Sequence, residues 1–337
     1  MTKTKKSWPV QLLLLGVLLV CIVLAACVGK YPVSPGESLK IMLAALMRKT
    51  GSTNEMTVNV VLGLRVPRIL ASVIVGAALS MSGAAYQGIF KNPLVSPDFL
   101  GVSSGACIGA AVAILMSLSA AYISVFAFVF GIAAVLITVA IPAVMGNRSN
   151  VMLVLCGIIV GTAMSSILGF IKYIADPNTQ LASITYWTMG SFSYITLNEL
   201  FAVLPIIAVP GVILILMAWW IDVLSMGEDE ARTLGARVGL IRGITIICAT
   251  LLTAASVCIA GTISWVGLIV PHFGRMAVGP SNRKLLPMCA LLGGLFMLAV
   301  DTLTRTIGTT EMPVSILTGV LGAPVFCWLL FKQRREL

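Results

Sequence analysis

Long uncharged stretches, separated by short polar segments, make up almost the whole chain. The first runs from about residue 7 to 29, and others cover about 151–171 and 200–221; a further apolar stretch, about 58–90, carries charges only at Arg65 and Arg68 near its start. A helix of about 20 apolar residues can cross the hydrocarbon core of a bilayer. The alternating ten-residue strands of an outer-membrane barrel are not seen. The pattern therefore predicts an all-α polytopic membrane protein.

Two longer uncharged intervals must each hold more than one segment. The interval between Asp98 and Arg148 leaves room for two spans joined by a turn near 117–122. The interval from Arg242 to Arg275 is too long for one untilted span and too short for two. We therefore expect a full span there, followed by a short helix.

Apolar segments near the C-terminus bring the number of predicted transmembrane helices to about ten. One ends near residue 304, and EMPVSILTG (311–319) opens the last. The stretch 181–195 is rich in Ser, Thr and aromatic residues, which favours an interfacial or re-entrant helix. Basic residues stand at both ends of the chain, and the positive-inside rule places such residues in the cytoplasm. Both termini are therefore expected to be cytoplasmic.

Composition agrees with this class and narrows the chemistry. Of the 337 residues, 59% are hydrophobic and 10% charged, so we treat 1–337 as a single transmembrane domain. The net charge of +10 comes from Lys and Arg between the spans, which indicates a lipid environment and no nucleic-acid partner. The sequence has no phosphate-binding loop, no catalytic triad, no metal-ligand spacing and no C-x-x-C among its eight cysteines. We expect no enzymatic activity, no cofactor and no metal site.

Ionisable groups inside the apolar segments are scarce. Asp301 is the acid that lies well inside such a segment, and Arg305 follows one helical turn later as its natural ion-pair partner. An ion-coupled secondary carrier, the alternative class, usually needs ionisable groups at mid-membrane. An ion gradient alone would drive uptake by such a carrier in proteoliposomes.

Small residues repeat at helical spacing after the second span. Gly101, Gly105 and Gly109 form a G-x-x-x-G ridge, which lets two helices approach closely. We expect this ridge to be a tightly packed helix contact of the dimer.

A charged segment, 226–239 (MGEDEARTLGARVG), lies between two apolar runs. Read as one helix, it has Ser225 and Glu228 at the spacing of a capping box, and Glu228 and Arg232 at the spacing of an i,i+4 ion pair. Gly235 stands where a helix can end or a neighbouring backbone can approach. The pattern alone favours a solvated helix that joins two spans.

The string GEDEARTLG resembles the coupling-helix signature G-E-E-A-A-R-S-L-G of the iron-siderophore, haem and cobalamin (FecCD-type) permeases of ATP-binding-cassette (ABC) importers. Asp229 departs conservatively from that signature, and Glu230 replaces its usual Ala. The resemblance implies that this helix seats in a cleft of a separate ATPase subunit. The residues implied in coupling are Gly227, Glu228, Asp229, Glu230, Ala231, Arg232, Leu234 and Gly235.

Three further blocks resemble the same family in the same order, so the resemblance covers nearly the whole chain. They are 65–106, 261–275 and 311–330. The resemblance implies a type II ABC importer permease fold in a bacterial or archaeal cytoplasmic membrane. It also implies a homodimer, two cytoplasmic ATP-binding subunits and an external solute-binding protein. The implied cargo is a metal chelate, first a ferric siderophore, with haem, cobalamin or molybdate and tungstate as alternatives.

Three arginines are implied in docking of the binding protein. The family's R-x-P-R and D-x-x-x-R blocks supply arginines that receive carboxylates from the two lobes of that protein, and the matching residues here are Arg65, Arg68 and Arg305. A guanidinium group suits this role because its planar fork binds a carboxylate through two hydrogen bonds. The pattern alone supports ordinary interfacial anchoring equally well.

Overall fold

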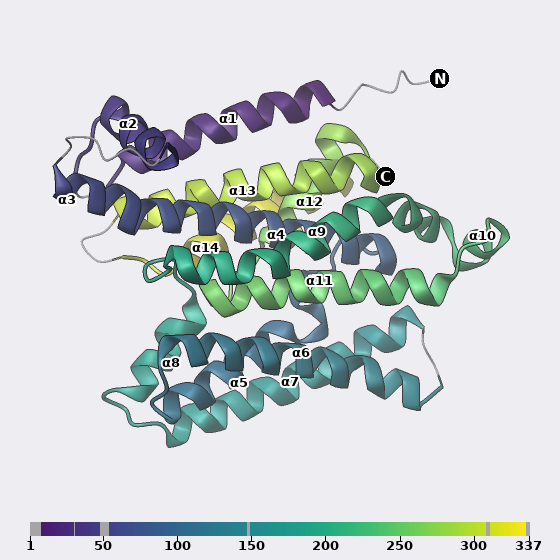
Figure 1. Cartoon of the computed structure of the whole chain (residues 1–337). Coiled ribbons are helices and arrows are strands. Elements are labelled where there is room, and N and C mark those ends of the chain that lie inside the picture. Colours follow the sequence, from purple (N-terminus) through teal and green to yellow (C-terminus); the bar gives the residue numbers. More distant parts are fainter. Residues whose placement is uncertain (1–7, 30, 48–53, 147–148, 308–310, 335–337) are drawn as a thin grey trace.

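The computed structural model of the protein describes residues 8–29, 31–47, 54–146, 149–307 and 311–334. All regular secondary structure in these ranges is helical. The long helices run roughly parallel and antiparallel to one another in a single bundle (Figure 1). The predicted all-α architecture is confirmed.

Seven helical stretches in the described ranges are long and apolar enough to cross a membrane. They are α1 (Trp8–Cys27), the continuous stretch Glu55–Phe90, α6 (Ala120–Val144), α7 (Asn150–Ile174), α9 (Leu197–Met226), α11 (Val238–Ala260) and α13 (Asn282–Thr306). Three shorter apolar helices are α5 (Val102–Leu115), α12 (Val266–Val278) and α14 (Val314–Arg334). Together they are the ten predicted segments. At 1.5 Å per residue, α5 and α12 are too short to cross a bilayer completely. This agrees with the short helix predicted before Arg275, but we expected a full span where α5 lies.

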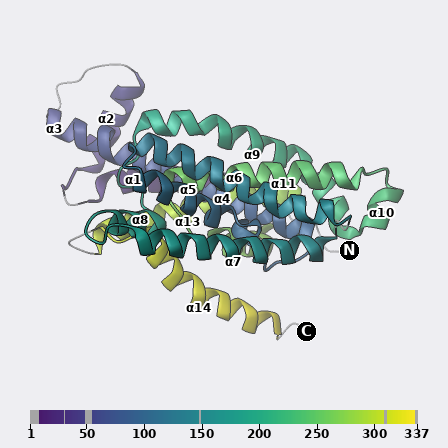
Figure 2. The ribbon, with the colours of Figure 1, turned by 90° about the horizontal axis from the view of Figure 1, so that it is seen from below.

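The remaining elements are short segments that flank or connect these helices. The stretch Glu55–Phe90 divides into α3 (Glu55–Val58), the π-helical turn η1 (Asn59–Arg65) and α4 (Val66–Phe90). The others are α2 (Pro35–Leu46), η2 (Pro97–Leu100), α8 (Gln180–Met189) and α10 (Glu228–Thr233). Helices α2 and α3 lie at one end and α10 at the opposite end (Figures 1 and 2). We call these the α2 end and the α10 end.

Helix α4 forms the centre of the bundle because small residues allow its neighbours to approach closely. It packs against α13, α11, α12 and α9, and most of its residues are buried. A Cβ atom added to Gly76 would collide with the backbone of Gly293 on α13, and one added to Gly83 would collide with Gly267 on α12. Backbones in such close contact exclude lipid and water from the middle of the protein.

Helix α14 has few neighbours within the chain. It contacts α12, α13 and α8 near its start and then diverges from the bundle (Figure 2). Gly319 has no atom within 4 Å of an added Cβ, whereas Gly322 lies against the ring of Trp265. Apolar side chains of α14, such as Val320 and Phe331, are exposed in the isolated chain. One face of α14 therefore lacks a protein neighbour within the described residues.

The glycine ridge packs inside the chain. Cβ atoms added to Gly105 and Gly109 would collide with the backbone of Phe130 and Phe126 on α6. Gly101 takes no part in this contact, because it adopts a left-handed conformation (φ +85°) between η2 and α5. Our expectation of a dimer contact along this ridge is corrected: α6 of the same chain occupies the face of Gly105 and Gly109, and Gly101 serves a turn.

A carboxylate joins two helices at the α10 end. Asp222 on α9 accepts hydrogen bonds from Ser281 Oγ (2.8 Å) and from the backbone N and Nδ2 of Asn282 (2.7 and 2.8 Å). These donors form the beginning of α13, where backbone N–H groups lack partners within the helix and a negative charge is favourable. Asp222 thus holds the end of α9 next to the start of α13, shortly before α10 begins at Glu228.

Candidate functional site

The charged segment 226–239 is not one helix. Helix α9 continues to Met226, α10 covers Glu228–Thr233, and α11 begins at Val238. The predicted capping box is wrong, because Gly227 precedes α10 without a side-chain cap and Ser225 donates instead to the carbonyl oxygen of Asp222. Gly235 ends α10 in the left-handed region (φ +78°), where its N–H bonds to the carbonyl oxygen of Arg232.

One side of α10 faces the bundle and the other faces outward. Ala231 is fully buried and holds the helix against its neighbours. Leu234 is 55% exposed, and the side chain of Asp229 is 95% exposed. In one continuous helix Ala231, Leu234 and Val238 would share a face, but the turn at Gly235 separates Val238 from the other two. The helix protrudes beyond the bundle (Figure 1), so its outer side is open to a partner.

Glu228 connects α10 to α11. Its carboxylate accepts a hydrogen bond from Arg242 Nη2, and Arg232 lies 3.8 Å away in the predicted i,i+4 pair. The hydrogen bond from Arg242, followed by the positive charges of Arg242 and Arg232, holds the pKa of Glu228 below its usual value despite partial burial. The pair with Arg232 is solvent-exposed and contributes little. Arg242 therefore fixes the orientation of α10, and sequence spacing did not identify it.

A groove lies beside α10 at this end of the bundle. Its volume is about 460 Å³. Its walls come from the start of α7, from α10 and from the start of α11: Ser149, Asn150, Val151, Glu228, Arg232, Val238, Gly239 and Arg242. The groove places the predicted coupling helix next to the first turn of a membrane-spanning helix. Helix α10 itself packs against α9 and α11, and the groove separates it from the start of α7.

A second charged site lies at the α2 end, where the three predicted docking arginines come together. Arg65, the last residue of η1, donates to the carbonyl oxygens of Ala26 (2.7 Å), Cys27 (3.3 Å) and Tyr31. It is 6% exposed. These bonds satisfy the carbonyl groups at the end of α1 and place a cation where the helix dipole is negative.

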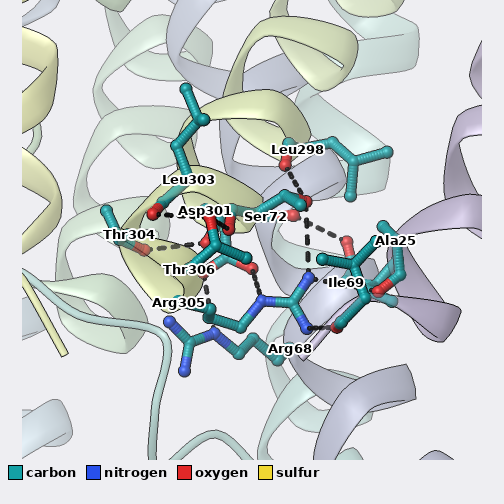
Figure 3. Close-up of polar contacts among 12 residues, drawn as sticks. Ala25, Arg68, Ile69, Ser72, Leu298, Asp301, Leu303, Thr304, Arg305 and Thr306 are labelled. Atoms are coloured by element: carbon teal, nitrogen blue, oxygen red, sulfur yellow. Dashed lines mark hydrogen bonds and ion pairs between the residues drawn. The ribbon is translucent and has the colours of Figure 1, made fainter. Parts of the chain in front are cut away.

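Arg68 and Arg305 share the buried carboxylate of Asp301 (Figure 3). Arg68 Nε donates to Asp301 Oδ1 at 2.7 Å, while Arg305 Nε lies 3.4 Å from Oδ2, an ion pair without hydrogen-bond geometry. Arg305 also donates to the carbonyl oxygens of Ala25 (3.3 Å) and Val28 (3.4 Å). The predicted pair between Asp301 and Arg305 is present, and the stronger bond to Arg68 was missed.

Arg68 has a second carboxylate partner, Glu311, at the start of the segment 311–319 that was predicted to open the last membrane helix. Arg68 Nη1 donates to Glu311 Oε2 at 2.8 Å and to Ser193 Oγ at 3.3 Å, and Ser193 also donates to Glu311. The side chains of Arg68 and Arg305 are each 8% exposed. None of the three arginines thus presents an open guanidinium face in this conformation. Their docking role stays a prediction. It requires that at least one of these arginines exchanges an internal partner for a carboxylate of the binding protein.

Metal-binding side chains are dispersed. Within the described ranges, no group of three or more His, Cys, Asp or Glu residues could hold a metal ion. The eight cysteines are free thiols, and most are buried among apolar side chains. The α10 end has a protruding helix and the α2 end has a group of ion pairs. These features suit contacts with other proteins more than covalent chemistry.

Comparison with known proteins gives relatives along almost the whole chain. The molybdate import system permease protein of Haemophilus influenzae is 36% identical over 331 residues, 98% of this chain and 97% of that protein. A probable iron chelatin transport system permease protein of Helicobacter pylori is 38% identical over 275 residues, 82% of this chain and 83% of that protein. Both proteins are permeases, and their named cargoes differ.

The fold matches a solved transporter. A structure described as an ABC transporter of metal-chelate type, in an inward-facing conformation, aligns with a TM-score of 0.86 and 33% identity. The alignment covers 96% of this chain and 99% of that one. The FecCD transport family matches residues 17–332, which sets aside the ion-coupled carrier left open by the sequence. The chain is therefore a non-enzymatic, multi-pass permease with the type II ABC importer fold, and it belongs to the FecCD transport family.

Proposed function

We propose that this permease carries a ferric siderophore into the cytoplasm as the membrane subunit of a metal-chelate importer. The observation that carries the proposal is the near-complete match to metal-chelate permeases, including the iron chelatin permease of Helicobacter pylori. Two buried arginines of the membrane helices, Arg68 and Arg305, are paired with Asp301 at the α2 end. A pathway without strong charged ligands suits a bulky chelate that has to be released again.

Molybdate is the second candidate, because the Haemophilus influenzae molybdate permease aligns with 98% of this chain. The two cargoes are distinguished in proteoliposomes that contain the permease, its ATPase and its binding protein. Uptake of a radioiron siderophore that unlabelled ferric siderophores inhibit and molybdate does not would support the first proposal. Inhibition by molybdate alone would replace it with the second.

The oligomer and its orientation belong to the same proposal. Two copies of the chain form a homodimer, which would cover the side of α14 that lacks a neighbour within the described residues. Two ATP-binding subunits bind at the α10 end in the cytoplasm, and the solute-binding protein binds outside at the α2 end. The start of α1 and the end of α14 lie toward the α10 end (Figures 1 and 2), in agreement with two cytoplasmic termini. Crosslinking of α14 to α14 in membranes tests the dimer.

Helix α10 transmits the motion of the ATPase in this proposal. Three features support it: the open outer side of the helix, its attachment to α11 through Glu228 and Arg242, and the adjoining groove at the start of α7. At the α2 end, we propose that carboxylates of the binding protein dock on Arg65, Arg68 and Arg305. Charge reversal at Arg68 should then weaken docking, more strongly at low salt than at high salt.

A further inference from the structure

Arg68, the central arginine at the α2 end, already binds two carboxylates within the chain. Its Nε bonds to Asp301 and its Nη1 bonds to Glu311, so it forms two ion pairs of 2.7 and 2.8 Å. An incoming carboxylate therefore finds both of these positions occupied. A carboxylate of another protein can take either of these two positions only if the internal acid that holds it leaves.

The two acids differ in how firmly they are held. Asp301 lies within α13, is fully buried and is also close to Arg305. The side chain of Glu311 is 45% exposed and belongs to a segment that precedes α14 without being helical itself. Displacing Asp301 would expose a buried pair of guanidinium groups, whereas Glu311 can move into water. Glu311 is thus the acid that can leave.

We propose that Glu311 occupies the place of the binding protein's carboxylate on Arg68, and that docking exchanges one carboxylate for the other. This inference rests on the docking role proposed above for Arg68. The exchange leaves Arg68 paired at every stage, which avoids the large cost of an uncompensated buried charge. Asp301 meanwhile keeps the guanidinium group aligned through the bond to Nε.

The exchange also changes how the start of α14 is held. Glu311 joins α4 to the segment before α14 and, through Ser193, to the loop after α8. Two neighbouring contacts continue this connection: Val314 N donates to the carbonyl oxygen of Gly190 (3.0 Å), and Ser315 Oγ donates to that of Thr262. Loss of the Glu311 contact removes the one charged member of this set. Docking outside would thereby loosen the beginning of a helix that runs toward the α10 end.

The test is the affinity of the solute-binding protein of the same importer for the full permease in nanodiscs. Glu311→Gln keeps the size of the side chain but removes its charge, so it should bind the protein about two- to fivefold more tightly, the range expected for a partly exposed ion pair. Glu55→Gln is the matched control. It removes one exposed acid at the same end, on α3, and among the described residues the carboxylates paired with Arg68 are those of Asp301 and Glu311. Arg68→Lys keeps a charge for Asp301 but lacks the fork that binds a second carboxylate.

The outcomes separate this inference from the docking proposal. Tighter binding by Glu311→Gln than by Glu55→Gln, with weaker binding by Arg68→Lys, supports the exchange. Weaker binding by Arg68→Lys together with equal affinities of the two glutamine variants overturns the exchange and leaves the docking role in place. If neither Arg68→Lys nor Glu311→Gln alters the affinity, both proposals fail. Weaker binding by Glu311→Gln also overturns the exchange, because Glu311 would then belong to the docking surface.

Discussion

Replacing Asp301 with Asn removes a negative charge that two buried guanidinium groups share. Removing one member of a buried ion pair typically costs about 3–5 kcal/mol, because the partner stays buried without compensation. Arg68 keeps Glu311 as a second carboxylate, so most of the cost falls on Arg305. The remaining partners of Arg305 are neutral oxygens at 3.3–3.4 Å. We therefore expect a loss near the lower end, about 3 kcal/mol.

The loss is measured as the free energy of unfolding of the purified permease in mixed micelles, titrated with SDS and followed by tryptophan fluorescence. Glu311→Gln is the comparison, because its half-exposed ion pair should contribute only about 0–1 kcal/mol. The double variant Asp301→Asn, Arg305→Gln should recover part of the loss, since it removes the uncompensated charge. The reasoning is refuted if Asp301→Asn costs no more than Glu311→Gln, or if the double variant is less stable than the sum of the single changes.

Three further predictions concern α4 and α10. Gly83→Ala should destabilise the fold by more than about 1 kcal/mol in the same titration, because the added Cβ meets the backbone of α12. Gly63→Ala should be nearly neutral, because an added Cβ there has open space, and equal effects of the two changes would contradict the close packing. The Gly235→Trp variant should insert into the membrane normally but hydrolyse ATP without transport. The Gly235→Asn variant should retain more coupling, because Asn tolerates a left-handed backbone. Unchanged transport by the Trp variant argues against the coupling role. The lowered pKa of Glu228 means that its bond to Arg242 stabilises the protein above the pKa of the unfolded chain, about 4.3, and is lost as the pH falls through the lower folded value. When the free energy of unfolding is measured at decreasing pH, the Glu228→Gln variant should therefore lose less stability than the wild-type protein. Identical losses for the variant and the wild type would contradict a stabilising bond between Glu228 and Arg242.

The membrane segments could be predicted from the sequence because a bilayer imposes a simple constraint. Backbone N–H and C=O groups have no water to bind in the hydrocarbon core, so an apolar run of sufficient length must be helical. Intervals between charges also predicted the two segments that α11 and α12 form, and the turn between α5 and α6. The resemblance in 226–239 likewise located α10, although local capping rules misplaced its start. Helix α9 continues through Ser225, which leaves that hydroxyl bonded within α9.

Most partners of the polar groups could not be predicted, because sequence spacing shows only neighbours on one helix. The pair of Asp301 with Arg305 was predicted from a four-residue interval. The same rule could not show that the glycine ridge faces α6, since a small-residue stripe looks identical whether its neighbour is in the same chain or in another copy.

Apolar runs and the charges between them were enough to predict the class of protein, the number of membrane segments and the positions of the charged residues at the two ends. Which charges meet depends on how the helices pack. Arg68 and Glu311 are separated by 243 residues in the chain, yet lie within 2.8 Å because α4, α13 and the segment before α14 converge at the α2 end. The physical reason is that apolar burial is non-directional and roughly additive along a sequence, whereas an ion pair depends on a distance that packing sets.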